Sequence, residues 1–150
     1  MGLDMYIQAK KFIWTDWEDP ASTRNTKNPL TKDLEDIGVG FRINYIIVEA
    51  AYWRKAYAIH QWFVTNIQKG QDDCNEYHVT RDHLRELKET CQKVLLIPQM
   101  AEILLPYKDF YSRSDQYNEF YFNELKRTIE QIDNLFKYPN AWDFDYHSSW

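Results

Sequence analysis

Glycine, proline and cysteine are all scarce in this chain. Its 150 residues include four glycines, five prolines and two cysteines. So few glycines leave little scope for a phosphate-cradling loop, and neither G-x-x-x-x-G-K-[ST] nor G-x-G-x-x-G occurs. The two cysteines, Cys74 and Cys91, are read as free thiols in a reducing compartment. The sequence therefore offers none of the common nucleotide-binding motifs.

Long apolar runs and an excess of positive charge are also missing. No uninterrupted apolar run approaches the ~18 residues of a membrane span, and the first residues show no signal-peptide pattern. The formal net charge is −5 and the pI is about 5.3. An acidic chain is poorly suited to electrostatic binding of DNA or RNA, which requires a cationic face. We therefore expect a cytoplasmic protein that binds neither membranes nor nucleic acids.

Aromatic residues, by contrast, are abundant. The chain has six Trp, eleven Tyr and eight Phe, and 44% of its residues are hydrophobic. A single domain spanning residues 1–150 is long enough to bury roughly 68–70% of its unfolded surface. Because so many rings exceed what a small core hides, we expect some of them in an oligomer interface, a partner surface or a ligand cleft. A homodimer is the oligomeric state we favour.

Period-two patterns predict at least two strands. Residues Met5–Trp14 are rich in β-branched and aromatic side chains, and Phe41–Val48 alternate between apolar and polar. The polar residues 16–40 between them are predicted to form a long surface loop. The stretch Glu76–Thr80 is predicted to form either a short third strand or an extended connection.

Spacings of three and four residues predict three main helices. The first is expected to run unbroken over Glu49–Gln68, with Gly70 at its C-terminal end. The second begins at the capping residue Thr80 and stops before Pro98, and the third begins near Asp115. Their buried stripes are predicted to be Leu84, Leu87, Cys91 and Val94 in the second, and Phe122, Leu125, Ile129, Ile132 and Phe136 in the third. We expect an α+β fold with three main helices packed on a small, mostly antiparallel sheet.

The stretch Ala51–Phe63 carries the first candidate site residues. On a continuous helix each residue turns by about 100°, so His60 would face inward near Trp53 while Arg54 and Lys55 point away. This separation would prevent His60 and Arg54 from acting on one small group. We expect a core-facing His60 bonded to backbone or to a tyrosine hydroxyl; the alternatives are a ligand contact in an aromatic cleft and a catalytic acid or base.

Residues 72–83 gather carboxylates, a thiol and imidazoles, which are the usual ligands of transition metals. The spacing of Cys74, His78 and His83 matches no standard zinc module, so we predict neither a metal nor a cofactor. A polar loop is the simpler interpretation.

Charged side chains at helix ends and in loops complete the candidate binding set. Arg54 and Lys55 are either solvated or grip a phosphate or carboxylate. Asp72 and Asp73 are expected to accept hydrogen bonds from Arg54, which would tie their loop to the first helix. Arg113, in the stretch FYSRSDQY, is positioned to contact a nucleotide or a peptide.

Four segments together resemble a family of small tailed-phage and prophage proteins of unknown function. They are MGLDMY, YWRKAYAIHQWF, DDC and ILLPYKDFYSRSDQYNEFYF. The similarity runs from end to end except in the long loop between the first two strands. Members of the family are sometimes labelled phosphoglycerate kinase, an enzyme with two large lobes and phosphate-binding loops that this chain lacks.

The resemblance implies a phage accessory protein made in the cytoplasm of the infected host, and it implies no reaction. We expect non-enzymatic binding of a host protein or of a small nucleotide-like ligand, in host takeover or anti-defence. One alternative is a small enzyme acting on a nucleotide or modified base, with His60 or the pair Asp72 and Asp73 as acid–base groups or metal ligands. Another is a minor component of the virion.

Overall fold

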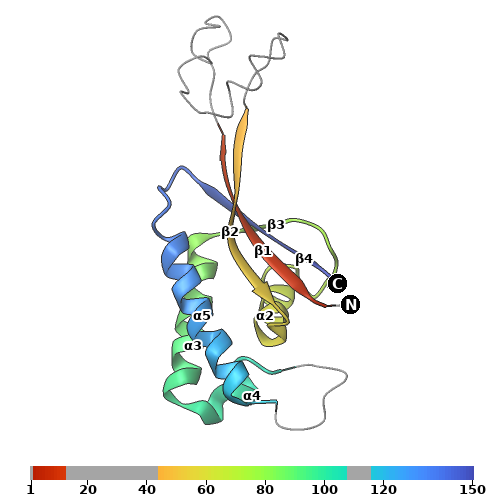
Figure 1. Cartoon of the computed structure of the whole chain (residues 1–150), viewed down its shortest axis with the longest axis vertical. Coiled ribbons are helices and arrows are strands. Elements are labelled where there is room, and N and C mark those ends of the chain that lie inside the picture. Colours follow the sequence, from red (N-terminus) through yellow and green to blue (C-terminus); the bar gives the residue numbers. More distant parts are fainter. Residues whose placement is uncertain (1, 13–43, 108–115) are drawn as a thin grey trace, which may run out of the picture.

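The computed structural model describes residues 2–12, 44–107 and 116–150. Within these residues, four strands form one antiparallel sheet in the order β2-β1-β4-β3 (Figure 1). The strands are β1 (Asp4–Phe12), β2 (Tyr45–Arg54), β3 (Tyr77–Val79) and β4 (Asp143–Ser149). The predicted first and third strands are therefore confirmed where they are described.

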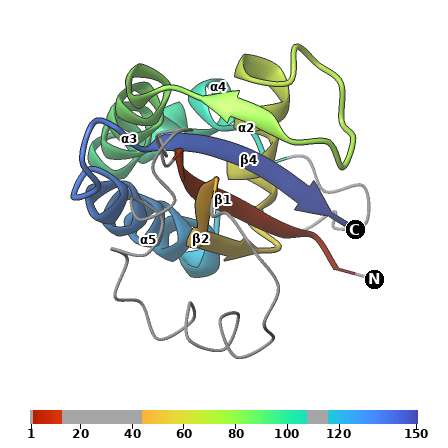
Figure 2. The ribbon, with the colours of Figure 1, turned by 90° about the horizontal axis from the view of Figure 1, so that it is seen from above.

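The helices of the same residues are α2 (Tyr57–Asn66), α3 (Arg81–Leu96), α4 (Ala101–Leu104) and α5 (Glu119–Leu135), with a 3₁₀ turn at Pro98–Met100. Helices α3 and α5 run side by side in opposite directions, while α2 lies beside them against the sheet (Figures 1 and 2). This arrangement is the predicted α+β fold. Throughout the described ranges, no helix combines the length and the apolar character needed to cross a membrane.

Alternation along the strands divides the sheet into a buried and an open face. Met5, Ile7 and Ala9 of β1 are fully buried, and the residues between them are partly exposed. The buried face packs on the helices, where the ring of Phe63 from α2 stacks on Tyr146 of β4 at a centroid distance of 4.0 Å. The core therefore lies between one face of the sheet and the helices.

Helix α3 follows its sequence prediction closely. The hydroxyl of Thr80 accepts a hydrogen bond from the backbone N–H of His83 at 3.1 Å, which caps the helix. All four residues of the predicted stripe are buried, and burial raises the pKa of the Cys91 thiol to about 12. In α5, Leu125 and Ile132 are buried, and the remaining predicted residues pack at the edge of the core.

The prediction of one continuous helix over Glu49–Gln68 is wrong. Strand β2 continues to Arg54, Lys55 adopts a left-handed conformation with φ of 57°, and α2 begins only at Tyr57. A β-bulge explains the error. Ile7 pairs with Ala51 but Gln8 pairs with Glu49, so Ala50 is an extra residue that breaks the period-two pattern. A strand with one inserted residue imitates the spacing of a helix.

Gly70 closes the turn after α2, as predicted, but at some distance from the helix end. It has φ of 83°, and its N–H donates to the carbonyl oxygen of Val64 at 2.8 Å. A positive φ at this position favours glycine, because glycine has no Cβ.

The C-terminal segment is central to the fold, although its pattern predicts no element. Strand β4 pairs with β1 on one side and with β3 on the other, and it buries Phe144, Tyr146 and Ser148. Both of its neighbours lie far away in sequence, so short-range patterns do not reveal this pairing.

Deleting residues 143–150 should therefore abolish folding, because β1 and β3 would lose their common neighbour. Removing only Trp150, whose side chain is about half exposed, should leave a folded protein. Far-UV circular dichroism and urea unfolding compare the two truncations. A cooperative unfolding transition in the longer deletion would contradict this account of the core.

Candidate binding site

The break at Lys55 separates the residues predicted to form one site. Trp53 is fully buried, and its indole N–H donates to the hydroxyl of Thr128 at 2.9 Å. Arg54 lies on the open face of the sheet, where its Nε is 3.8 Å from Asp4 Oδ1. Trp53 is thus a core residue, and Arg54 makes a partly screened surface ion pair.

His60 is buried in α2 and bonded through both ring nitrogens. Nδ1 lies 2.7 Å from the hydroxyl of Tyr146, and Nε2 lies 3.0 Å from Asp72 Oδ1. Because an ionised carboxylate only accepts, Nε2 carries the proton and Nδ1 accepts from the tyrosine. Burial lowers the pKa of His60, and the opposing effect of Asp72 is smaller. This is the core-facing arrangement predicted for His60.

The hydrogen-bonded relay Asp72–His60–Tyr146 contains the carboxylate, imidazole and hydroxyl of a catalytic triad. The solvent exposure of its carboxylate and its hydroxyl, however, is reversed. In a working triad the hydroxyl faces the substrate and the carboxylate is buried. Here Tyr146 is fully buried, and burial raises the pKa of its hydroxyl, whereas the Asp72 side chain is 53% exposed. The relay therefore fastens a loop to the core and offers no accessible nucleophile.

The prediction that Arg54 bonds to both aspartates is wrong. Asp73 instead accepts from the backbone N–H of Asn75 and from the hydroxyl of Tyr77, both at 3.0 Å, and these bonds lower its pKa. Across the described part of the chain, no group of three or more His, Cys, Asp or Glu side chains is placed to hold a metal ion. Arg113 lies outside the described residues.

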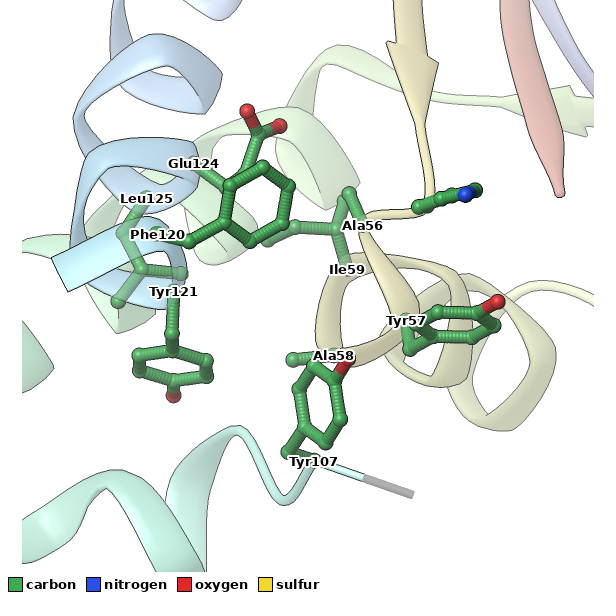
Figure 3. A pocket seen from close by; sticks show the side chains of 10 residues that line it. Ala56, Tyr57, Ala58, Ile59, Tyr107, Phe120, Tyr121, Glu124 and Leu125 are labelled. Carbon is green, nitrogen blue, oxygen red and sulfur yellow. The ribbon is translucent and has the colours of Figure 1, made fainter. Parts of the chain in front are cut away.

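A small aromatic pocket lies where β2 passes into α2 (Figure 3). Its walls are the rings of Tyr57, Tyr107, Phe120 and Tyr121, which come from α2, from the residues after α4 and from the start of α5. Lys55 also lines it, and it is the one residue to do so among the predicted binding residues that the structure describes.

The aromatic walls are held in place by mutual packing. Tyr57 and Tyr107 meet edge to face at 5.7 Å, and Tyr107 and Tyr121 do so at 6.5 Å. The hydroxyl of Tyr121 donates to the carbonyl oxygen of Leu105 at 2.9 Å. The walls of the pocket are therefore largely fixed before any ligand arrives.

Glu124 supplies a carboxylate, the only one among the described residues that line the pocket. Its side chain is 13% exposed, and Oε2 is buried without a hydrogen-bond partner. Its Oε1 lies 3.8 Å from Arg127 Nη1, too far for a hydrogen bond. Burial raises the pKa of Glu124, and Arg127 partly opposes this rise. A buried carboxylate oxygen is normally hydrogen-bonded, so this one calls for a donor.

The turn at Lys55 shapes the mouth of the pocket. A non-glycine residue with a left-handed backbone costs about 1–3 kcal/mol, and such strain is found at functional sites. The backbone N–H of Lys55 donates to the carbonyl oxygen of Leu3 at 2.8 Å, which holds the turn in place. The strained turn brings the first residues of α2 into the pocket wall.

The size of the pocket limits what it accepts. Its cavity volume is about 10 Å³, which is the room of one water molecule. Pockets that enclose whole small molecules measure ≈ 300–1,000 Å³. This pocket fits the end of a side chain, and a nucleotide is far too large for it.

A larger hollow of about 520 Å³ lies on the open face of the sheet, between Tyr45, Ile47 and the charged Lys10, Asp143 and Asp145. Lys10 already pairs with Glu76 at 2.6 Å and with Asp145 at 2.8 Å. His78, which also lines the hollow, has its Nδ1 3.4 Å from Asp145 Oδ1. The basic side chains among its described lining residues are thus paired within the chain, so this hollow is a weaker candidate than the pocket at Glu124.

Sequence reasoning missed Glu124 and the rings around it. A signal was present in α5, because Glu124 lies three residues after the buried Tyr121 and four before the buried Thr128. A glutamate at that spacing lies at the border of the buried stripe.

Comparison with known proteins adds no assignment: no family model, no curated protein and no solved structure matches this chain. The resemblance to phage proteins therefore stays a prediction.

His60 should make stability depend on pH. Its pKa is lower in the folded than in the unfolded protein, so the unfolded state binds more protons as the pH falls below about 6.5. The free energy of unfolding should therefore drop between neutral and mildly acidic pH. This drop should be smaller in His60→Gln and should persist in the control His78→Gln, whose side chain is 59% exposed. Urea unfolding at several pH values measures it, and equal pH dependence in all three proteins would contradict the assignment.

Proposed function

We propose that the protein is a non-enzymatic binding module that recognises a protein partner by receiving one cationic side chain in the aromatic pocket. The observation that carries this proposal is that Glu124, whose buried Oε2 has no hydrogen-bond partner, lines the same pocket as four aromatic residues. Arg127 lies 3.8 Å from Oε1 without bonding to it, and a cationic donor would supply the hydrogen bond that Oε2 lacks.

The chemistry of the walls supports a cation. Aromatic faces are negative at their centres and attract ammonium and guanidinium groups, most strongly where water is excluded. When it is ionised, the largely buried Glu124 adds a negative charge beside these rings, which Arg127 offsets in part. Lysine and arginine ends therefore match the pocket in charge, while their apolar stems match its rings.

The size of the pocket supports a protein partner over a free nucleotide. A space of about 10 Å³ receives one small group, and the rest of the partner must then bind outside it. The net charge of −5 favours the approach of a basic surface.

We place this binding activity in the cytoplasm of a phage-infected host. The resemblance of four segments to small tailed-phage and prophage proteins supports that setting. In it, the partner is a host protein that presents a lysine or arginine, and its capture serves host takeover or anti-defence.

Alkylammonium and alkylguanidinium ions are simple probes of the pocket. We expect n-butylammonium or ethylguanidinium, at millimolar concentration, to raise the melting temperature of the protein, because a ligand of the folded state stabilises it. Glu124→Gln should abolish this rise. The matched control is Glu119→Gln, which changes an exposed carboxylate at the start of the same helix and should keep the rise.

Phe120→Ala removes a half-exposed ring from the pocket wall and keeps the Glu124 carboxylate. It should reduce the rise in melting temperature without abolishing it. Equal responses of the wild type and Glu124→Gln would contradict the proposal, because the carboxylate would then take no part in binding the cation. In capture from host lysate, a partner should be retained by wild type and Glu119→Gln and lost with Glu124→Gln.

A further inference from the structure

Strand β2 forms one edge of the sheet, and only part of that edge is covered. In an antiparallel sheet, successive residues direct their backbone groups alternately to one side and to the other. At Tyr52 these groups point outward and meet α5: its N–H donates to Gln131 Oε1 at 2.7 Å, and its carbonyl accepts from Arg127 at 3.3 Å. The second half of β2 is thus blocked to any further strand.

The first half of β2 has no such cover among the described residues. Of the strands that the structure describes, β1 alone pairs with it there, with Lys10 opposite Ile47 and Phe12 opposite Tyr45. Because Ile7 and Ala9 use the bonds between β1 and β2, the backbone groups of Tyr45, Ile47 and Glu49 face outward.

The open segment Tyr45–Glu49 is also apolar. The exposed fractions are 57% for Tyr45, 55% for Ile47 and 37% for Val48. Ile47 lies on the open face of the sheet and Val48 on the helix face, so apolar surface is exposed on both sides. Proline and lysine, which natural proteins use to protect a free edge, are absent from these five residues; Glu49 is their one charged residue, and the bulge at Ala50 lies beyond them.

We infer that this segment pairs with the same segment of a second copy, antiparallel and centred on Ile47. Two four-stranded sheets then become one continuous eight-stranded sheet. The outward-facing donors and acceptors of Tyr45, Ile47 and Glu49 meet equivalent groups of the partner copy. This names the surface of the homodimer that the aromatic composition predicts.

The segment is self-complementary in length and in charge. A two-fold axis at Ile47 places Ile47 opposite its own counterpart, Tyr45 opposite Glu49, and Ile46 opposite Val48. No like charges face each other, since the single charged residue, Glu49, lies across from a tyrosine. Pairing ends after five residues, before the stretch of β2 that α5 covers.

A register-specific cross-link tests this pairing. In a Cys74→Ser background, Ile47→Cys should form a disulfide-linked dimer under mild oxidation, because directly opposed Cα atoms lie within the ~4.4–6.8 Å that a disulfide spans. Glu49→Cys is the control: its counterpart lies four residues out of register, at least ~13 Å away, and should not cross-link. The native Cys91 is fully buried.

Sedimentation of the uncross-linked protein provides the second measurement. Wild type should be a dimer at micromolar concentration, and Ile47→Lys should be a monomer with unchanged circular dichroism. Ile103→Lys should remain a dimer; it changes a 73% exposed residue of α4, at the end of the molecule away from the start of β2 (Figure 1). A monomeric wild type, equal cross-linking of both cysteine variants, or a dimer that resists Ile47→Lys would overturn the inference.

Discussion

The turn at Lys55 is the constraint on which the rest of the arrangement depends. Within two residues the chain leaves the sheet and begins α2, through a left-handed backbone that a lysine adopts only at a cost. The hydrogen bond from Lys55 N–H to Leu3 ties this turn to the start of β1. Before the turn, Arg54 lies on the open face of the sheet beside Asp4, and after it His60 faces Tyr146 in the core.

Two buried polar side chains, His60 and Glu124, differ in whether their polar atoms have hydrogen-bond partners. His60 is buried, yet both of its ring nitrogens have partners, so its polarity contributes to holding the loop of Asp72. Glu124 is almost as well buried, but its Oε2 has no hydrogen-bond partner. Satisfied buried groups support a fold, whereas an unsatisfied charge destabilises it unless a ligand completes it. For this reason the proposed binding function rests on Glu124, whereas His60 contributes to the fold.

Sequence patterns predicted the elements that are formed by local contacts. The cap at Thr80 and the stripe of α3 depend on residues three and four apart, and they were predicted correctly. The end of β2 was predicted wrongly, because the extra residue Ala50 makes the pattern of this strand resemble that of a helix. Strand β4 was missed because both strands that flank it lie far away in the chain. Of the predicted binding residues that the structure describes, Lys55 lines the pocket. The rest of the pocket was not predicted, because it joins three segments whose contact no short pattern encodes.

The most direct test of the central claim is an NMR titration of the Glu124 side-chain carboxyl, with and without n-butylammonium. In the free protein its pKa should lie above that of an exposed glutamate, because burial disfavours the charged form. The bound cation should lower this pKa, since it stabilises the ionised carboxylate. An ordinary pKa that the cation leaves unchanged would contradict the account, because Glu124 would then be neither desolvated nor in contact with the ligand.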